Sequence, residues 1–241
     1  MRQQFETVLF DFGGTLDSDG VAWKERMHAH YRSEGLALSA EDFAAVFYAA
    51  DDPLVGGLPE DADLAITVVG LARNLEAELS RGTREAPAHS AGPGSRRAEL
   101  VAERFLAAAE ASFARNRPLL HRLGQRYRLG VVSNFYGNLE AVCRGAGLVP
   151  PLAVMIDSQK LGAEKPDPAI FHAALDALGA RPETTLMVGD SLRRDREGAR
   201  RTDMGFVWIA PADVQAAEVR ARGPLDHPVV ARLSDLEEML L

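Results

Sequence analysis

The side chains best suited to chemistry in this 241-residue sequence stand just after short apolar runs. Asp11 follows VLF, Ser133 ends GVVS, and Asp190 follows MVG with Asp195 shortly after it. Because ligands bind at the carboxyl ends of parallel strands, we expect these groups at one edge of a sheet. Three carboxylates gathered there would repel each other and any phosphate unless cations offset them. Mg²⁺, which prefers oxygen ligands, and Lys165 would supply that positive charge.

The elements that must position these residues follow from the hydrophobic pattern. The apolar runs are short and several are rich in β-branched residues, which is typical of buried parallel strands. Helical periods accompany the later runs, so we predict an α/β fold with a doubly wound, Rossmann-like parallel sheet. The predicted strands are residues 8–10, 129–132, 153–156, 186–188 and 206–209, and the predicted helices are residues 118–126, 139–145, 168–178 and 192–201.

The stretch from residue 21 to residue 116 has a different pattern. It is Ala-rich, largely helical in period and without a convincing strand run, which predicts an inserted all-helical cap. We therefore assign residues 1–20 and 117–241 to a Rossmann-like core and residues 21–116 to the cap. A helical stripe is predicted at Leu64, Val68, Leu71, Leu75 and Leu79.

Local signals mark several element ends. Ser39 to Asp42 and Ser234 to Glu237 have the spacing of a capping box, which predicts a helix start at each place. Residues 87–95 read PAHSAGPGS, which predicts a loop inside the cap and leaves its order open.

In this order and at these spacings, the segments around Asp11, Ser133, Lys165 and Asp190 closely resemble the haloacid dehalogenase-like (HAD) hydrolase superfamily. Most of its members are Mg²⁺-dependent phosphatases. The resemblance covers residues 7–15 and 117–241, and the helical insertion matches the position of the superfamily's helical cap. As a set these motifs are highly specific.

The resemblance implies a role for each residue and a cofactor, Mg²⁺. Attack by Asp11 on phosphorus would give an aspartyl-phosphate, with Lys165 steadying both the nucleophile and the phosphate. The substrate would be a small phosphorylated metabolite. The implied substrate-binding residues are Ser133, Asn134 and Lys165, and the implied metal ligands are Asp11, Asp190, Asp195 and the main-chain carbonyl of Gly13.

Gly13 is a departure from the superfamily's phosphatases. They carry an Asp two residues after the nucleophile, which protonates the leaving oxygen and later activates water. A glycine cannot move a proton, and general acid–base help is worth roughly 10²- to 10⁴-fold, so we expect slow turnover or a need for good leaving groups. Asp17 or Asp19, just beyond the turn, would replace this acid only if its geometry allowed.

Three other functions stay open. A phosphonatase-like C–P hydrolase has a small residue two after the nucleophile and a Schiff-base lysine in the cap. Lys24 is the only lysine in the predicted cap, but it lies much nearer the nucleophile motif than that branch's lysine. A haloacid dehalogenase proper is disfavoured, because that branch needs no metal and this chain keeps the GDSLRRD arrangement. A non-catalytic protein that binds phosphate or a partner is supported directly only by Gly13.

Composition narrows the partners and the location. The chain has 27 basic and 35 acidic residues, a net charge of −8, and no long basic tract, which disfavours nucleic acid as a partner. No apolar run approaches about 18 residues, so no membrane partner is expected. Cys143 is the only cysteine, which excludes an intrachain disulfide and, without a signal peptide, favours the cytoplasm. Both a monomer and a homodimer are compatible with the sequence.

Other conspicuous residues have ordinary interpretations. The arginines of residues 193–201 are expected to form a solvated helix face, and Trp23 and Trp208 are expected to pack in the core. The six histidines show no metal-ligand spacing beyond His28 and His30, which would point to different faces of a helix.

Overall fold

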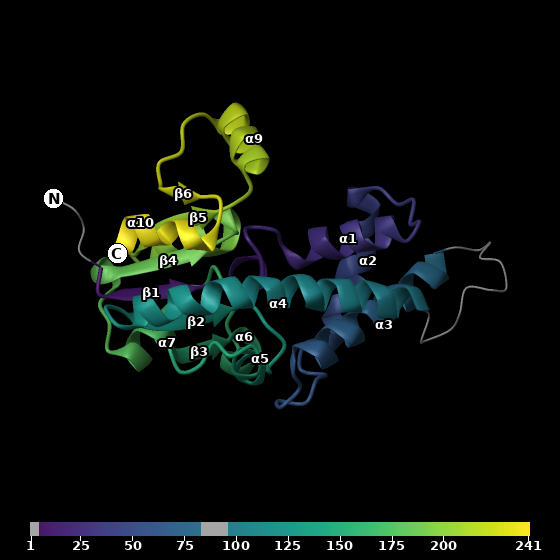
Figure 1. The fold of residues 1–241 in the computed structure, drawn as a ribbon, viewed down its shortest axis with the longest axis horizontal. Helices are drawn as coiled ribbons and strands as arrows, with labels where there is room; N and C mark the ends of the chain where they lie inside the picture. The colour runs from purple at the N-terminus through teal and green to yellow at the C-terminus, as the bar shows by residue number, and fades with distance from the viewer. Residues whose placement is uncertain (1–4, 83–95) are drawn as a thin grey trace.

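The computed structural model describes residues 5–82 and 96–241, and within them it confirms the predicted α/β fold. Six parallel strands form one sheet in the order β3-β2-β1-β4-β5-β6 (Figure 1). Each of the five predicted strands lies inside an observed one, and β6 was missed because two residues make no pattern. The strands are β1 (Thr7–Phe10), β2 (Arg128–Ser133), β3 (Leu152–Asp157), β4 (Thr185–Gly189), β5 (Gly205–Ile209) and β6 (Val229–Val230).

The order of the strands creates a ligand-binding edge beside β1. The chain builds outward from β1 to β3 and then returns to the other side of β1 to form β4. Phe10, the last residue of β1, is in register with Val131 of β2 and Val188 of β4. In sheets of this kind ligands bind outside the carboxyl ends of the strands, where the winding direction changes.

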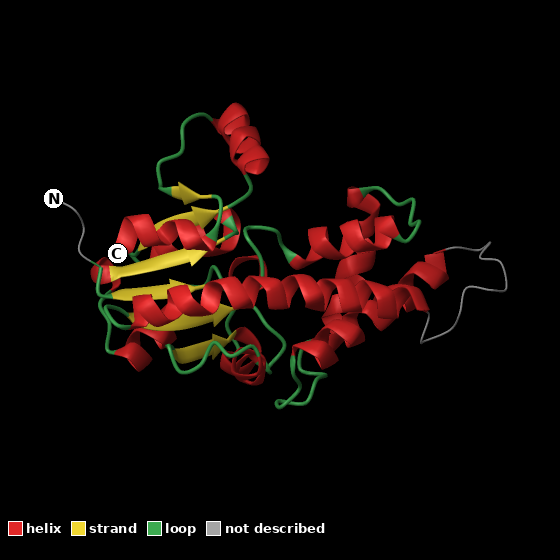
Figure 2. Cartoon of the chain, viewed as in Figure 1, coloured by secondary structure: helices red, strands yellow, loops and turns green. Residues whose placement is uncertain are grey.

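Both faces of the sheet are covered by helices (Figure 2). Alternate side chains of a strand point to opposite faces. Phe10 therefore packs in one cluster with α4, α5 and α10, while Leu9 packs in another with α7 and α8, and both are fully buried. The helices that follow the insertion are α5 (Leu139–Gly145), α6 (Ser158–Leu161), α7 (Pro168–Leu178), α8 (Glu197–Arg201), α9 (Ala212–Arg222) and α10 (Leu236–Leu240).

The insertion is helical throughout its described part, as predicted, and it extends away from the sheet (Figure 1). Val68, Leu71 and Leu75 of the predicted stripe are fully buried. The Oγ of Ser39 accepts a hydrogen bond from the Asp42 amide at 3.1 Å, which confirms that helix start. The loop predicted at 87–95 lies outside the described residues. The helices are α1 (Trp23–Ser33), α2 (Ala40–Asp51), α3 (Leu64–Gly82) and α4 (Arg96–Gly124).

Two local predictions are wrong. Helix α4 does not begin at Pro118 but runs through it, because buried residues such as Phe113 and Leu119 continue one apolar face on both sides. The predicted boundary between residues 116 and 117 therefore falls inside a helix, and the division into core and cap stays a prediction. Ser234 does not cap the last helix, since the carboxylate of Asp235 accepts from the amide of Arg232 at 2.9 Å instead.

Among the described helices, none is both long and apolar enough to cross a bilayer.

Candidate active site

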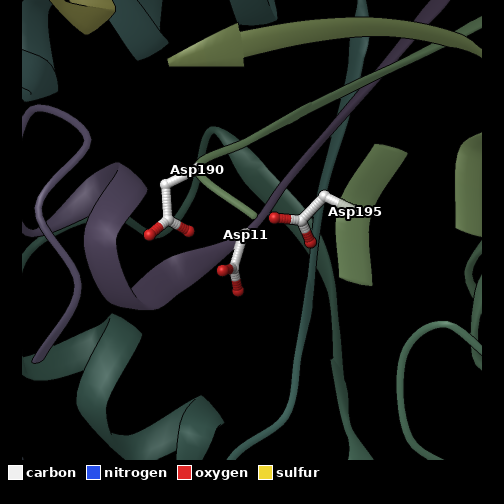
Figure 3. A group of neighbouring side chains, drawn as sticks. All are labelled: Asp11, Asp190 and Asp195. Carbon is white, nitrogen blue, oxygen red and sulfur yellow. The ribbon is translucent and has the colours of Figure 1, made fainter. Parts of the chain in front are cut away.

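Three aspartates meet at the carboxyl edge of the sheet, as the sequence predicts (Figure 3). Asp11 directly follows β1, Asp190 directly follows β4, and Asp195 lies in the turn after it. Each offers a carboxylate oxygen within 4.8 Å of the others. They are brought together because β1 and β4 are neighbours in the sheet.

Asp11 is held in one orientation by its Oδ1 atom. This oxygen accepts hydrogen bonds from the Phe12 amide at 2.7 Å and from the Ser133 hydroxyl at 2.8 Å. It also lies 2.7 Å from the Nζ of Lys165. No residue within 5–82 or 96–241 donates a hydrogen bond to Oδ2. One oxygen of Asp11 is therefore fixed, and the other is left for a ligand.

Lys165 lies between two of the carboxylates. Its Nζ is 2.7 Å from Asp195 Oδ1, the same distance as from Asp11, and the residue is only 3% exposed. Burial disfavours the charged ammonium, but Asp11 and Asp195 outweigh that effect, so the pKa of Lys165 is raised. The lysine therefore stays positively charged at neutral pH.

Asn134 fixes the main chain of Lys165. Its Oδ1 accepts from the Lys165 amide at 2.7 Å, and its Nδ2 donates to the Lys165 carbonyl at 3.2 Å. Both ends of the side-chain amide are thus used to position the lysine, although Asn134 also lines the cavity described below. Direct substrate binding by Asn134 stays a prediction.

Negative charge is in excess at this site. Burial raises the pKa of Asp195 to about 6, against the pull of Lys165. Burial, together with the charges of Asp11 and Asp195, raises the pKa of Asp190 well above its usual range. No residue that the structure describes donates a hydrogen bond to the Asp190 carboxylate. One lysine among three carboxylates leaves room for a further cation.

Two glycines make space for these carboxylates. Gly14 has φ of 88°, and a Cβ there would lie 2.4 Å from Asp190 Oδ2. A Cβ at Gly189 would lie 2.2 Å from Asp195 Oδ2. Any side chain at either position would displace a carboxylate of the cluster.

The donor set fits a hard, oxygen-preferring metal ion. Clustered carboxylates are the ligands that divalent ions such as Mg²⁺ favour. A cation would offset both the burial and the mutual repulsion that raise the pKa values of Asp190 and Asp195. Gly13 lines the same cavity, and a role for its carbonyl as a metal ligand stays a prediction. The three aspartates can hold a metal ion. The oxygens of Asp190 are the most available to it, because no described residue donates a hydrogen bond to them.

A cavity of about 640 Å³ opens from the cluster. The sheet edge contributes Asp11 and Ser133 to its wall, and the helical insertion contributes Lys24 and Asp51. Such a volume suits a small molecule. Sequence patterns could not show which insertion residues reach this wall, because that depends on where α1 and α2 are placed in the folded protein.

Trp23 occupies the space beside Gly13. A Cβ at Gly13 would lie 3.2 Å from the indole Nε1, which in turn donates to Asp17 Oδ2 at 2.7 Å. Asp17 is fully buried, accepts from the Gly14 amide at 2.7 Å and pairs with Arg26. Its two oxygens are therefore already bonded within the fold.

Asp19 also points to other partners. Its Oδ2 lies 3.0 Å from the Arg115 guanidinium, and its Oδ1 accepts from the Leu233 amide at 3.2 Å. Neither acid beyond the turn is thus placed to replace the one that Gly13 lacks.

Some residues that were expected only to pack or to face solvent also line the cavity. Trp23 and Trp208 are buried as predicted, and both also line the cavity. Arg193 and Arg194 are exposed, as predicted, and they also line the cavity. The arginines further along pair with acids, as Arg200 does with Glu197 at 2.8 Å.

Comparison with known proteins agrees with this fold. Residues 5–203 match the family model described as haloacid dehalogenase-like hydrolase. That match covers most of the chain, and the chain therefore belongs to the haloacid dehalogenase-like hydrolase family.

Curated relatives match over part of their length. A haloacid dehalogenase-like hydrolase domain-containing protein 3 from Bos taurus is 36% identical over 100 residues, which is 42% of this chain and 40% of that protein. A phosphoserine phosphatase from Thermus thermophilus is 36% identical over 97 residues, 40% of this chain and 36% of the relative. A glyceraldehyde 3-phosphate phosphatase from Methanothermobacter thermautotrophicus is 32% identical over 118 residues, 47% of this chain and 51% of the relative. The chain thus matches about half or less of each relative.

Solved structures match over the whole chain at lower identity. A crystal structure of a dehalogenase superposes with a TM-score of 0.60 at 22% identity, covering 100% of this chain and 99% of the other. A HAD phosphatase from Thermococcus onnurineus gives a TM-score of 0.52 at 23% identity, covering 98% of both chains. At these identities the likeness shows the shared fold.

Proposed function

We propose that this protein is a Mg²⁺-dependent phosphohydrolase that cleaves the phosphate ester of a small metabolite through an aspartyl-phosphate on Asp11. One observation carries the proposal. Asp11 is held through Oδ1 by Ser133 and Lys165, while its Oδ2 accepts no hydrogen bond from the described residues. A carboxylate that is oriented by one oxygen and free at the other is suited to attack a phosphorus atom in line.

The chain's own residues would divide the first step between them. Oδ2 of Asp11 attacks phosphorus, the bond from phosphorus to the ester oxygen breaks, and its electron pair leaves with that oxygen. The Lys165 ammonium and the Ser133 hydroxyl offset the charge on the transferring group. When bound by Asp11, Asp190, Asp195 and the Gly13 carbonyl, Mg²⁺ would add positive charge at the phosphoryl oxygens.

Water completes the reaction in a second step. Its oxygen attacks phosphorus, the bond from phosphorus to Asp11 breaks, and the carboxylate is restored as phosphate leaves. Gly13 supplies no acid or base for either step. The rate therefore depends on the leaving group or on a proton donor elsewhere in the cavity.

The named relatives support the substrate class. Phosphoserine phosphatase and glyceraldehyde 3-phosphate phosphatase are named for small phosphorylated metabolites. The cavity is large enough for such a molecule. Its wall carries positive charge from Lys24 and Arg193 and negative charge from Glu25 and Asp51.

The test is phosphate release from a panel of phosphate esters, with Mg²⁺ and with a chelator. We expect release that needs the metal and that is lost in Asp11→Asn. Asp176→Asn is the matched control, because Asp176 is exposed on α7 and does not line the cavity. Release that continues in Asp11→Asn, or that the chelator does not reduce, would contradict the proposal.

A second candidate, a phosphonatase-like hydrolase, has one observation in its favour. Lys24, the lysine it requires, lines the same cavity as Asp11. Its Nζ lies 3.5 Å from Glu25 and 5.5 Å from the centre of the Tyr48 ring. Borohydride trapping with a carbonyl-bearing phosphonate would label Lys24 if it forms a Schiff base, and Lys24→Arg with full activity would remove this candidate.

A further inference from the structure

The proposed reaction needs a proton at the leaving oxygen, and the loop after the nucleophile does not provide one. Gly13 has no side chain, while Asp17 and Asp19 are bonded to other parts of the fold. A donor must therefore come from elsewhere on the cavity wall.

Asp51 is the carboxyl group on that wall best placed for the task. It ends α2 and lines the same cavity as Asp11. The other carboxyl that the insertion contributes to this wall, Glu25, has a side chain 54% exposed and lies 3.5 Å from Lys24, so it is solvated and paired. Asp51 is only partly exposed and has no ion pair among the described residues.

Tyr136 holds the Asp51 carboxyl in place. Its hydroxyl donates to Asp51 Oδ1 at 2.6 Å, and the tyrosine is 7% exposed. Tyr136 comes three residues after Ser133, in the loop that leaves β2 at the active edge of the sheet. This hydrogen bond therefore connects the helical insertion to the strand that carries a phosphate-binding residue, and it leaves Oδ2 of Asp51 free to carry a proton.

Trp23 connects Gly13 to the Asp51–Tyr136 pair. The Trp23 indole would lie within 3.2 Å of a Cβ at Gly13, and its ring centre is 6.0 Å from that of Tyr136. Gly13, Trp23 and Tyr136 are thus successive neighbours along one wall, with Asp51 beyond them. Gly13 and Asp51 line the same cavity, so a proton donor on Asp51 faces the space that the substrate would fill.

The surroundings of Asp51 keep it protonated to higher pH than an ordinary carboxyl. Burial is the largest effect and raises its pKa, with help from the charge of Asp52. The hydrogen bond from Tyr136 and the charge of Arg194 act in the opposite direction without cancelling it.

We propose that Asp51, positioned by Tyr136, donates the proton to the leaving oxygen in place of the acid that Gly13 lacks. The assignment rests on the proposed phosphohydrolase function. As the bond from phosphorus to the ester oxygen breaks, that oxygen takes the proton of Asp51 and departs as an alcohol. When water then attacks the aspartyl-phosphate, the Asp51 carboxylate takes a proton from it, so both steps balance.

The experiment compares an alkyl phosphate, whose leaving oxygen needs a proton, with 4-nitrophenyl phosphate, whose leaving group does not. In Asp51→Asn we expect kcat/KM for the alkyl ester to fall by about 10²- to 10⁴-fold and that for the aryl ester to change little. Asp61→Asn is the matched control, because Asp61 is an exposed acid of the same insertion that does not line the cavity. It should leave both rates unchanged.

The pH dependence of the rate gives a second measurement. It would not change if Asp51 had only a structural role. Because the acid must be protonated, the alkyl-ester rate should fall as pH rises through the pKa of Asp51, and Asp51→Asn should lack this limb. Tyr136→Phe removes a hydrogen bond that stabilises the carboxylate, so the limb should shift to higher pH. This variant also serves if Asp51→Asn does not fold.

The outcomes separate this assignment from the function on which it rests. Wild-type protein that releases phosphate from neither ester contradicts both. Active wild-type protein with an equal loss on both esters in Asp51→Asn, or with no loss on either, overturns the assignment alone. An alkaline limb that is unchanged in Tyr136→Phe overturns it as well.

Discussion

The Nζ of Lys165 lies 2.7 Å from Asp11 Oδ1, and the same atom is equally close to Asp195. All three side chains are largely buried, so this ammonium is the main counter-charge for two carboxylates that have little contact with solvent. Replacing Lys165 by Met would leave those charges uncompensated. Breaking a buried pair in this way costs about 3–5 kcal/mol in free energy of unfolding.

We therefore expect Lys165→Met to unfold at markedly lower urea concentration and to lose phosphate release. Addition of Mg²⁺ should restore part of the stability, because a metal ion bound only by the folded site replaces some of the lost positive charge. Lys160→Met is the control, since Lys160 forms an exposed pair with Glu60 at 2.9 Å and such pairs contribute little. A change as small as that of the control would show that Lys165 does not stabilise the cluster.

Cys143 should be inert in the folded protein. It is fully buried in α5, and burial raises the pKa of its thiol to about 12. Because the thiolate is the reactive form, almost none is present at neutral pH. We expect no reaction with a disulfide reagent under native conditions and one equivalent after denaturation. Ser234→Cys, which adds a thiol at an exposed position, should react at once. Rapid native labelling of wild-type Cys143 would contradict the described packing of α5.

The sheet and the aspartate cluster could be predicted because each rests on a short local signal. Asp11, Ser133 and Asp190 follow apolar runs, and strand ends of a parallel sheet meet at one edge. Helices 139–145 and 168–178 were predicted with the observed bounds, since their apolar positions and flanking residues agree. Pro118 misled the prediction because proline is common at the first turn of a helix, whereas here the apolar face of α4 continues through it.

The cavity wall could not be predicted, because its residues come from elements that meet only in the folded protein. Asp51 and Tyr136 are 85 positions apart and share no pattern, yet they are hydrogen-bonded. Asn134 and Lys165 are likewise joined by hydrogen bonds across 31 positions that no sequence pattern shows, and direct substrate binding by Asn134 stays a prediction. A cytoplasmic location and a monomeric or homodimeric state stay predictions.

Gly14 should be required for metal binding. A Cβ there would lie 2.4 Å from Asp190 Oδ2 and would push away the carboxylate with the fewest other bonds. The backbone also has φ of 88°, which costs a residue other than glycine about 1–2 kcal/mol. We expect Gly14→Ala to weaken Mg²⁺ binding, measured by calorimetry, by more than about tenfold, as loss of a ligand's orientation does.

Gly35→Ala separates the two effects of that substitution. Gly35 has the same φ of 88°, and a Cβ there would meet nothing within 4 Å. Gly35→Ala should lower the free energy of unfolding by the backbone cost alone and leave the Mg²⁺ affinity unchanged. If Gly14→Ala only destabilises the protein and binds Mg²⁺ as wild type does, Asp190 is not a metal ligand.

Gly13→Asp should destabilise the protein as well as add a carboxyl group at the position where the family's phosphatases carry one. A side chain at residue 13 meets the Trp23 indole at 3.2 Å, and Trp23 is held by its hydrogen bond to Asp17 and by edge-on packing against Phe105 at 5.0 Å between ring centres. Overpacking of this kind costs about 1–3 kcal/mol. We expect Gly13→Asp to lower the free energy of unfolding by that order, with a smaller loss in Gly13→Ala.

The contact with Trp23 can be isolated by a double-mutant cycle with Trp23→Leu, followed by urea denaturation. The destabilisation by Gly13→Asp should shrink in the Trp23→Leu background, because the smaller side chain gives way. If the two substitutions are additive, the indole is not what opposes a side chain at residue 13.

The rate of alkyl-phosphate hydrolysis by Gly13→Asp gives a second measurement. Because we propose that the cavity already has a proton donor, the added acid should raise this rate by less than about tenfold. A gain that approaches the full 10²- to 10⁴-fold worth of acid–base help would mean that the wild-type cavity has no such donor.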